Sequence, residues 1–272
     1  MKYIDIHCHL DREDYGTDFE EVLARMKEKR IGAIAIGADF PSSKKAVAIA
    51  EQNENIWACI GIHPGYVSEA FPLAARVEDE LLGLEELIKS PKVVGVGECG
   101  LDWFRLDLAS AKTVANKQKE LFEKQIEFAI KHNKPLMLHI RATQNSFDAY
   151  KDVLEILNHY KKEAGGKLRG NVHFFAGDVE IAKKFLDLNF TLSFAGVITF
   201  IRDYDEVIKY VPQERLMSET DAPFVAPVPF RGQRNEPSFV IEIIKKLAEI
   251  RGEDFDSLNS AILANAKRVF GI

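Results

Sequence analysis

The sequence predicts a (β/α)8 barrel (a TIM barrel) formed by a single domain over residues 1–272. Three observations indicate this fold: eight short apolar segments recur along the chain, longer amphipathic segments separate them, and most of the apolar segments are continuous. Continuous apolar strands are typical of a parallel sheet that is covered on both faces by crossover helices. Eight such units close a barrel, and 272 residues are enough for one.

The segments expected to form strands are rich in Val, Ile, Leu and aromatic residues. They are Tyr3–His7, Gly32–Gly37, Trp57–Ile62, Val93–Glu98, Pro135–His139, Asn171–Phe174, Thr191–Phe194 and Leu216–Glu219. The segments expected to form helices begin with capping residues or repeat apolar residues at spacings of three and four. They are Phe19–Lys29, Ser43–Gln52, Lys117–His132, Phe147–Tyr160, Val179–Leu188 and Pro237–Arg251. An open doubly wound sheet is the alternative, but no G-x-G-x-x-G turn follows the first strand.

The composition excludes several classes of protein. Hydrophobic residues make up 46% of the chain and charged residues 29%, which is ordinary for a folded domain. The 36 Lys and Arg against 42 Asp and Glu give a net charge of −6, which argues against bulk electrostatic coating of nucleic acid. No segment has the roughly 18 consecutive apolar residues of a membrane helix. With only three scattered cysteines and no apolar leader, we expect a cytoplasmic protein with no membrane partner and no obligate protein partner.

Histidines gather at the C-terminal ends of the predicted strands. Five of the seven lie at or just after such an end, namely His7, His9, His63, His139 and His173. Glu98 ends the fourth strand and Asp221 follows the eighth. Side chains from different strands of a barrel converge at this end, where barrel enzymes carry out their chemistry. A single buried histidine is usually a hydrogen-bonded core residue, but five on one rim with two carboxylates indicate a metal site.

The segment His7-Cys8-His9 is the strongest short motif. Side chains two apart on a strand point to the same side, so both imidazoles can reach one metal while Cys8 points away. Asp5 shares their side and is a candidate to orient a ligand. We expect Cys59 to be a small buried core residue and Cys99 to be buried near the site. His132 and His159 have charged neighbours on predicted helices and are expected at the surface.

Six ligands from this rim would be too many for one tetrahedral catalytic zinc, which keeps one position open. It suits two divalent cations about 3.5–4 Å apart that share a carboxylate. Glu98 lies on a strand between the other ligand-bearing strands, so we expect it to be the bridge. Asp221 is the better candidate for a terminal ligand that also accepts a proton from the attacking water. Mixed imidazole and carboxylate ligands accept Zn, Mn, Mg or Co.

The chain resembles the TatD-type metal-dependent deoxyribonucleases, a branch of the metal-dependent hydrolase barrels. The matching pieces run in order through the whole chain, and they are specific in combination although each is weak alone. They are residues 5–10 (DIHCHL), 61–64 (GIHP), 97–103 (GECGLDW), 135–141 (PLMLHIR), 172–177 (VHFFAG), 219–224 (ETDAPF), 227–237 (PVPFRGQRNEP) and 265–270 (NAKRVF).

The resemblance implies a barrel with a dinuclear metal site and hydrolysis of DNA phosphodiester bonds, with 3′ to 5′ exonuclease action. Its metal ligands would be His7, His9, Glu98, His139, His173 and Asp221. His63 would lie near the metals and help to bind substrate. The chain departs from the family where Ala142-Thr143 follows Arg141, where Trp103 replaces a common tyrosine, and in an insertion-like stretch over Phe104–Val114.

The expected reaction is attack on phosphorus by a water held near Glu98 and Asp221. Arg141, Arg231 and Arg234 are candidates to bind the non-bridging phosphate oxygens, because the planar guanidinium matches phosphate. Trp103 and Phe104 are candidates to stack on a base. The acidic net charge favours a short contact with DNA, at a strand end.

The alternative function is an amidohydrolase or lactonase that acts on a small-molecule amide or ester, since the same metal site could serve it. Many such barrels bridge their metals with a modified lysine from the fourth strand. Here the nearby Lys92 precedes that strand and lies at its wrong end.

Overall fold

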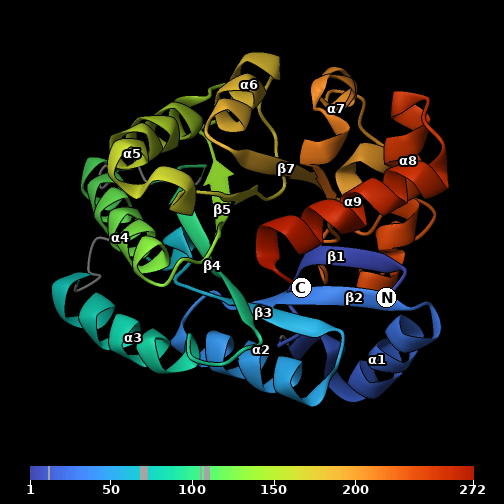
Figure 1. Cartoon of the computed structure of the whole chain (residues 1–272), viewed down its shortest axis with the longest axis horizontal. Helices are drawn as coiled ribbons and strands as arrows, with labels where there is room; N and C mark the ends of the chain where they lie inside the picture. The colour runs from blue at the N-terminus through green and yellow to red at the C-terminus, as the bar shows by residue number, and fades with distance from the viewer. Residues whose placement is uncertain (12, 68–72, 105, 107–110) are drawn as a thin grey trace.

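Eight parallel strands form the centre of the molecule in the computed structural model, which describes residues 1–11, 13–67, 73–104, 106 and 111–272 (Figure 1). In chain order they are β1 (Tyr3–Cys8), β2 (Ile31–Ile36), β3 (Ile56–Ile60), β4 (Val93–Asp102), β5 (Leu136–Arg141), β6 (Gly170–Val172), β7 (Phe190–Phe194) and β8 (Leu216–Ser218). Each strand pairs in parallel with the next one along the chain. All eight predicted strands are confirmed, and β4 runs four residues further than expected.

The sheet closes on itself through backbone contacts between the segments that follow β1 and β8. Cys8 and Ala222 form a parallel bridge, and the His9 N–H donates to the Ala222 carbonyl over 2.7 Å. The Asp221 N–H donates to the His7 carbonyl over 2.9 Å. The predicted (β/α)8 barrel is therefore confirmed, and its last contacts are made by the residues that carry the candidate site.

Helices surround the barrel. They are α1 (Phe19–Glu28), α2 (Phe40–Gln52), α3 (Leu73–Leu87), α4 (Ala111–Lys131), α5 (Asp148–Ala164), α6 (Val179–Asp187), α7 (Asp205–Tyr210), α8 (Val240–Arg251) and α9 (Phe255–Phe270). Short 3-10 helices are η1 (Glu13–Asp18), η2 (Pro64–Tyr66), η3 (Gly165–Lys167), η4 (Gly196–Thr199), η5 (Gln213–Arg215) and η6 (Pro237–Phe239). The six predicted helical segments are confirmed. α3 and α7 lie between strands, where a helix is expected but no bounds were predicted, and α9 is an additional helix. Among the described residues, every helix is too short or too polar to span a lipid bilayer.

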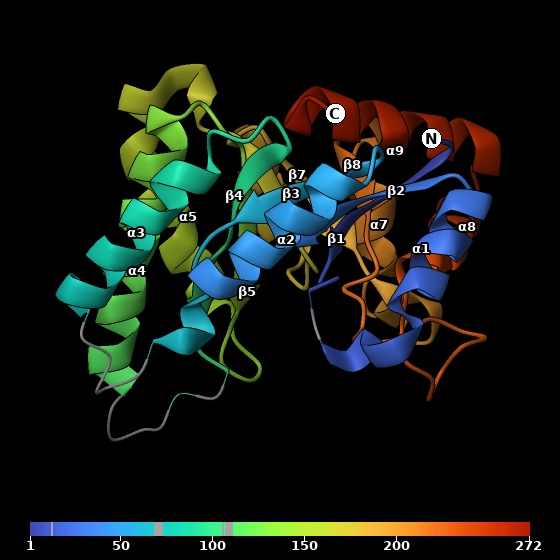
Figure 2. The ribbon, with the colours of Figure 1, turned by 90° about the horizontal axis from the view of Figure 1, so that it is seen from below.

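The two ends of the barrel differ in what covers them. α9 lies across the N-terminal end together with both chain termini, as Figure 2 shows. The loops that follow the strands emerge at the opposite end. Part of the insertion-like stretch, residues 105 and 107–110, lies outside the described residues, and its last part begins α4. The C-terminal end is therefore left to the loops and to the histidines at the strand ends.

Candidate metal centre

The six candidate ligands converge at the C-terminal end of the barrel. They surround the bottom of a pocket of about 370 Å³, and the pocket lining includes His9, His63, Glu98, His139, His173 and Asp221. His7 lies beneath, fully buried, and its ring stacks on that of His173 with 3.7 Å between the centroids. Side chains from β1, β4 and β5, and from the segments after β1, β3, β6 and β8, thus meet in one place.

Glu98 lies at the centre of the cluster, and its two carboxylate oxygens face different sets of ligands. Oε1 lies 2.6 Å from His139 Nδ1 and 3.0 Å from His173 Nε2. Oε2 lies 3.6 Å from His7 Nε2 and 3.7 Å from His9 Nε2. A carboxylate with this arrangement can serve two cations at once, one through each oxygen.

The first set, His7, His9, Asp221 and Glu98 Oε2, fits a divalent cation. Asp221 Oδ1 lies 3.7 Å from His7 Nε2 and 3.6 Å from His9 Nε2. These distances are too long for hydrogen bonds, but four tetrahedral ligands at about 2.0–2.2 Å from a cation lie at about this separation. Within the described residues, neither ring nitrogen of the buried His7 has a hydrogen-bond partner. A buried imidazole without partners is costly, and a cation at Nε2 would satisfy it.

The second set, Glu98 Oε1, His139 and His173, has a supporting carboxylate behind each imidazole. Glu219 Oε1 lies 3.1 Å from His173 Nδ1, and Asp102 Oδ2 lies 3.1 Å from His139 Nε2. Such carboxylates fix the tautomer and orientation of metal-binding histidines. The sequence reasoning did not assign either residue, although both lie in the quoted motifs.

Glu219 is held more rigidly than Asp102. It is fully buried, and it accepts hydrogen bonds from the Phe174 N–H and the Ser193 hydroxyl, both over 2.6 Å. Asp102 is half-buried at the end of β4 and accepts from the Phe104 N–H over 3.2 Å. The orientation of His173 is therefore fixed by the core, and that of His139 by the rim.

Asp5, the candidate to orient a ligand, contacts the backbone of the ligand-bearing segments. Its carboxylate accepts the N–H groups of His7 and Thr220 and the Thr220 hydroxyl. This contact joins β1 to the segment after β8 and so sets the positions of His7 and Asp221. Asp221 has a φ of 55°, in the left-handed region that Asp tolerates better than most residues.

Two glycines allow β4 to bring Glu98 against β5. Gly97 and Gly100 have φ values of 144° and 140°, which other residues rarely adopt. A Cβ on Gly97 would lie 2.3 Å from the Met137 carbonyl oxygen, and one on Gly100 would lie 2.1 Å from that of His139. The G-E-C-G segment is thus required by the close approach of these two strands.

The three cysteines stay out of the cluster. The thiol of Cys8 points away from the two histidines, toward the Ile34 carbonyl at 3.5 Å, as the strand alternation predicts. Cys59 and Cys99 are buried as expected, and all three are free thiols. His159 is exposed, and His132 is half-buried beside Glu85 on α3.

The pKa values of the clustered side chains are shifted in different directions. Burial alone would raise the pKa of Glu98, but His173, His63, His7 and His139 outweigh it and hold that pKa well below its usual value. Burial likewise opposes protonation of His173, and Glu219 and Glu98 outweigh it and raise its pKa. Burial, reinforced by the positive charge of His173, lowers the pKa of His7. The central carboxylate is therefore ionised and the deepest imidazole neutral, which are the forms that bind divalent cations.

His63 lies beside the cluster as a neutral hydrogen-bond donor. Burial and the nearby His139 lower its pKa to about 4. Its Nδ1 accepts the Gly65 N–H over 2.8 Å, so the remaining proton is on Nε2, which lies 3.6 Å from Glu98 Oε1. This position allows His63 to donate to a group bound in the pocket.

The three arginines expected to bind phosphate are placed differently from one another, and none of them is among the described residues that line the pocket. Arg141 stacks on Phe104 and Arg231 on Phe200, both exposed, with 4.0 and 3.9 Å from guanidinium carbon to ring centroid. Arg234 is bound instead by Asp18, at 2.7 and 2.5 Å, and stabilises the contact between η1 and the loop after β8. Of the three, Arg141 and Arg231 are therefore exposed at the rim, and Arg231 also donates from Nη1 to the Ala226 carbonyl over 3.1 Å.

Of the two aromatic residues expected to stack on a base, Trp103 packs against the core and Phe104 is exposed. The Nζ of Lys119 on α4 lies 5.4 Å from the centroid of the Trp103 ring. Phe104 has 45% of its surface exposed. Trp103 therefore holds the loop after β4 against α4.

Comparison with known proteins gives one consistent family. The model of the TatD related DNase family matches residues 4–271. The chain is 39% identical to the uncharacterized metal-dependent hydrolase YabD of Bacillus subtilis, over 98% of each chain. It is 32% identical to the uncharacterized metal-dependent hydrolase YcfH of Escherichia coli, over 100% of this chain and 97% of that one.

A solved structure supports the same assignment. The TatD homologue YjjV of Escherichia coli superimposes with a TM-score of 0.85 at 27% identity, over 100% of this chain and 98% of that one. Sequence, barrel topology and the donor set at the strand ends agree. The chain belongs to the TatD family and is a metal-dependent hydrolase.

Proposed function

We propose that this hydrolase cleaves DNA phosphodiester bonds with two divalent cations, and removes nucleotides from the 3′ end of a strand. The observation that carries the proposal is the position of Glu98, whose two oxygens face two separate sets of nitrogen and oxygen ligands. His7, His9 and Asp221 would complete one cation site, and His139 and His173 the other. Divalent cations held there would lower the pKa of water and neutralise charge on a phosphate.

The residues of the chain supply the remaining steps. Asp221 is ionised, because His9, His173 and His7 outweigh the effect of burial and lower its pKa. Its carboxylate would accept the proton of the attacking water. His63 would donate from Nε2 to a non-bridging oxygen, and so orient the phosphate for in-line attack. The strand ends hold these groups in place before substrate arrives, because each is fixed by the barrel backbone.

Two exposed arginines at the rim favour a nucleic-acid strand over a small neutral amide as the substrate. Arg141 and Arg231 are exposed at different places on the rim, one at the end of β5 and one in the segment after β8. Each is stacked on an exposed phenylalanine, and Arg231 also donates from Nη1 to the Ala226 carbonyl over 3.1 Å, which leaves its other N–H groups for phosphate oxygens. We propose that they contact phosphates next to the one that is cleaved. The acidic chain favours this short contact over a long electrostatic groove.

The experiment is a nuclease assay on single-stranded DNA labelled at the 5′ end. The protein is stripped of metal and then supplied with manganese, magnesium, zinc or cobalt. We expect a ladder that shortens from the 3′ end and requires metal. Asp221→Asn, assayed beside it, should lose about 10²–10⁴-fold in turnover, as expected when a general base is removed.

The opposite result is equally informative. If the protein binds two equivalents of metal but cleaves no DNA, the site is real and the substrate is wrong. The small-molecule amidohydrolase or lactonase function would then replace the nuclease. Cleavage that persists unchanged in Asp221→Asn would point to a contaminating nuclease.

A further inference from the structure

Exposed aromatic side chains are concentrated in the segments that follow the C-terminal ends of strands, and two of them line the metal pocket. In the described part of the chain, four of the five exposed Phe, Tyr and Trp side chains follow the C-terminal ends of strands. They are Tyr66 after β3, Phe104 after β4, Phe200 after β7 and Phe224 after β8, with exposures between 39% and 46%. The fifth, Tyr210, ends α7. Burial cannot explain a concentration of large apolar rings at one end, and such patches mark binding surfaces.

Two of these rings belong to the pocket itself. Tyr66 and Phe224 line it together with the candidate ligands. The Phe224 ring lies 6.0 Å from that of His9, and the Tyr66 ring lies 6.4 Å from that of His63. They come from the segments after two non-adjacent strands, β8 and β3, one beside the first set of ligands and the other beside the residue expected to hold the phosphate.

The size of the pocket limits what can lie between them. Its volume of about 370 Å³ is near the lower end of the range for small-ligand sites, about 300–1,000 Å³. A single nucleotide fits such a space, and a base pair with both its strands does not. A phosphate at the ligands would bring the attached sugar and base up to the level of the two rings.

Building on the proposed function, we propose that Tyr66 and Phe224 stack on the base of the nucleotide being removed. They are specificity-determining residues that select a strand end whose last base is unpaired. Stacking uses the flat face that every base has, so it discriminates by pairing state and not by sequence. Phe104 and Phe200 are not among the described residues that line the pocket, and with the arginines stacked on them they would contact the neighbouring nucleotides.

The test compares variants on two single-stranded DNAs that differ only in the base to be stacked. One carries a normal 3′-terminal nucleotide, and the other ends in an abasic tetrahydrofuran nucleotide. The variants are Tyr66→Ala, Phe224→Ala and Tyr66→Phe, with Tyr210→Ala as an exposed aromatic control on α7. Metal content and thermal melting of each variant are measured alongside, so that loss of the site or of the fold is recognised.

We expect Tyr66→Ala and Phe224→Ala to raise KM on the normal strand about tenfold or more, with kcat changed little. On the abasic strand the same variants should match the wild type, because no base remains to be stacked. Tyr66→Phe keeps the ring and should retain the difference between the two strands, and Tyr210→Ala should behave as wild type.

Three results would overturn the inference. An equal loss on both strands would mean that the rings only support the pocket, and no loss on either would mean that they do not contact the base. In either case the proposed function stands, because the wild type still cleaves the normal strand. If the wild type cleaves neither strand with any metal, both fail together.

Discussion

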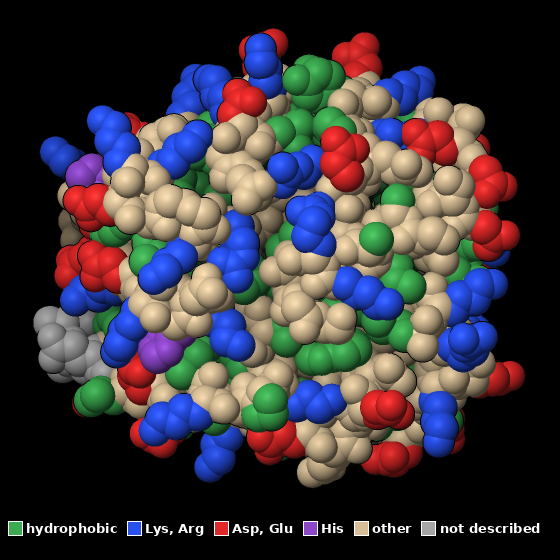
Figure 3. Space-filling model, viewed as in Figure 1, with side chains coloured by type: hydrophobic (Ala, Val, Ile, Leu, Met, Phe, Trp, Pro, Cys, Tyr) green, Lys and Arg blue, Asp and Glu red, His purple; other side chains and the backbone are tan. Residues whose placement is uncertain are grey.

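The two ends of the barrel use charged side chains in opposite ways. At the C-terminal end, carboxylates and imidazoles face one another across a shared space, and His7 keeps both ring nitrogens without a hydrogen-bond partner among the described residues. At the N-terminal end, basic side chains donate to backbone and amide oxygens and close the ends of helices. Figure 3 looks at this second end, where Lys and Arg side chains are spread across the face.

The N-terminal contacts follow the barrel repeat. Lys92 precedes β4 and donates from Nζ to the carbonyls of Asn53 and Glu54, which follow α2, both over 2.8 Å. Arg169 precedes β6 and donates to the carbonyl of Asn133, which follows α4, over 2.9 Å. A cation at the C-terminal end of a helix is stabilising because it satisfies free carbonyls and opposes the helix dipole.

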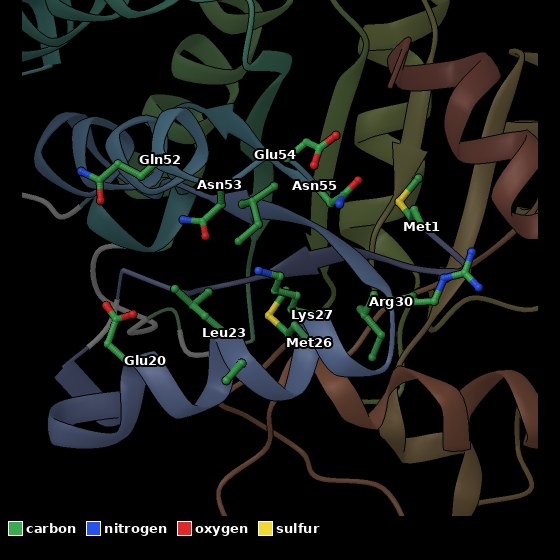
Figure 4. A pocket seen from close by; sticks show the side chains of 13 residues that line it. Met1, Glu20, Leu23, Met26, Lys27, Arg30, Gln52, Asn53, Glu54 and Asn55 are labelled. Carbon is green, nitrogen blue, oxygen red and sulfur yellow. The ribbon is translucent and has the colours of Figure 1, made fainter.

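A groove at the N-terminal end is also surrounded by charged side chains, in contrast to the imidazoles and carboxylates of the metal pocket. It has a volume of about 480 Å³ and lies between α1 and the loop from α2 to β3, with Glu20, Lys27, Arg30 and Glu54 around it (Figure 4). Within the described residues, all four groups of His and carboxylate side chains close enough to share a cation lie at the other end of the barrel. Charged side chains therefore serve stability at one end of the barrel and ligand binding at the other, so substitutions should separate the two properties.

The largest effect is expected from Glu98→Gln. The change removes the negative charge that both sets of ligands share, so the protein should lose bound metal and at least about 10³-fold in activity. Metal content measured by atomic emission after dialysis, together with turnover on DNA, checks this. Glu120→Gln, an exposed carboxylate on α4, is the control. Full metal occupancy in Glu98→Gln would show that Glu98 is not the bridge.

A smaller effect separates the two carboxylates behind the imidazoles. In the wild type, the fully buried Glu219 carboxylate accepts from a backbone N–H and a hydroxyl. Glu219→Gln replaces one of its oxygens with an NH2 group that cannot accept. We expect metal affinity to fall about 10–100-fold and the free energy of unfolding to fall by about 1–3 kcal/mol. Asp102→Asn lies at the half-buried rim and should lower metal affinity by about tenfold with little change in stability. Titration of metal-stripped protein and denaturant unfolding measure the two quantities. Equal stability losses in both variants would contradict the distinction between core and rim.

Most of the architecture could be predicted because buried parallel strands leave a continuous apolar signal. All eight strands were found in this way, since each is buried on both faces. α7 has six residues, too few to show a helical period. α9 carries its signal, with Asp254 as the cap and Leu258 and Ile262 on its buried face, but the eighth unit was already complete with α8.

The candidate ligands could be predicted because a barrel brings all strand ends to one rim. Glu219 and Asp102 could not, because their roles depend on which ring nitrogen His173 and His139 present to Glu98. The spacing of residues along a strand does not predict which ring nitrogen faces Glu98. The ion pair of Arg234 with Asp18 joins residues that are 216 positions apart, so only the folded chain reveals that this guanidinium is occupied.

The smallest effect is expected from Lys92→Met at the N-terminal end, which tests whether stability and activity depend on different ends of the barrel. The ammonium of Lys92 donates to three carbonyl oxygens, those of Asn53, Glu54 and Ile56. Methionine keeps the length of the side chain but leaves these carbonyls to water, so the free energy of unfolding should fall by about 0.5–1.5 kcal/mol. Activity and metal affinity should stay at the wild-type level, because the site lies at the other end of the strands. Lys89→Met, an exposed residue paired only with Glu86 among the described residues, should change neither property and serves as the control. A loss of activity in Lys92→Met at a temperature where the protein is fully folded would mean that the two ends are coupled through the barrel.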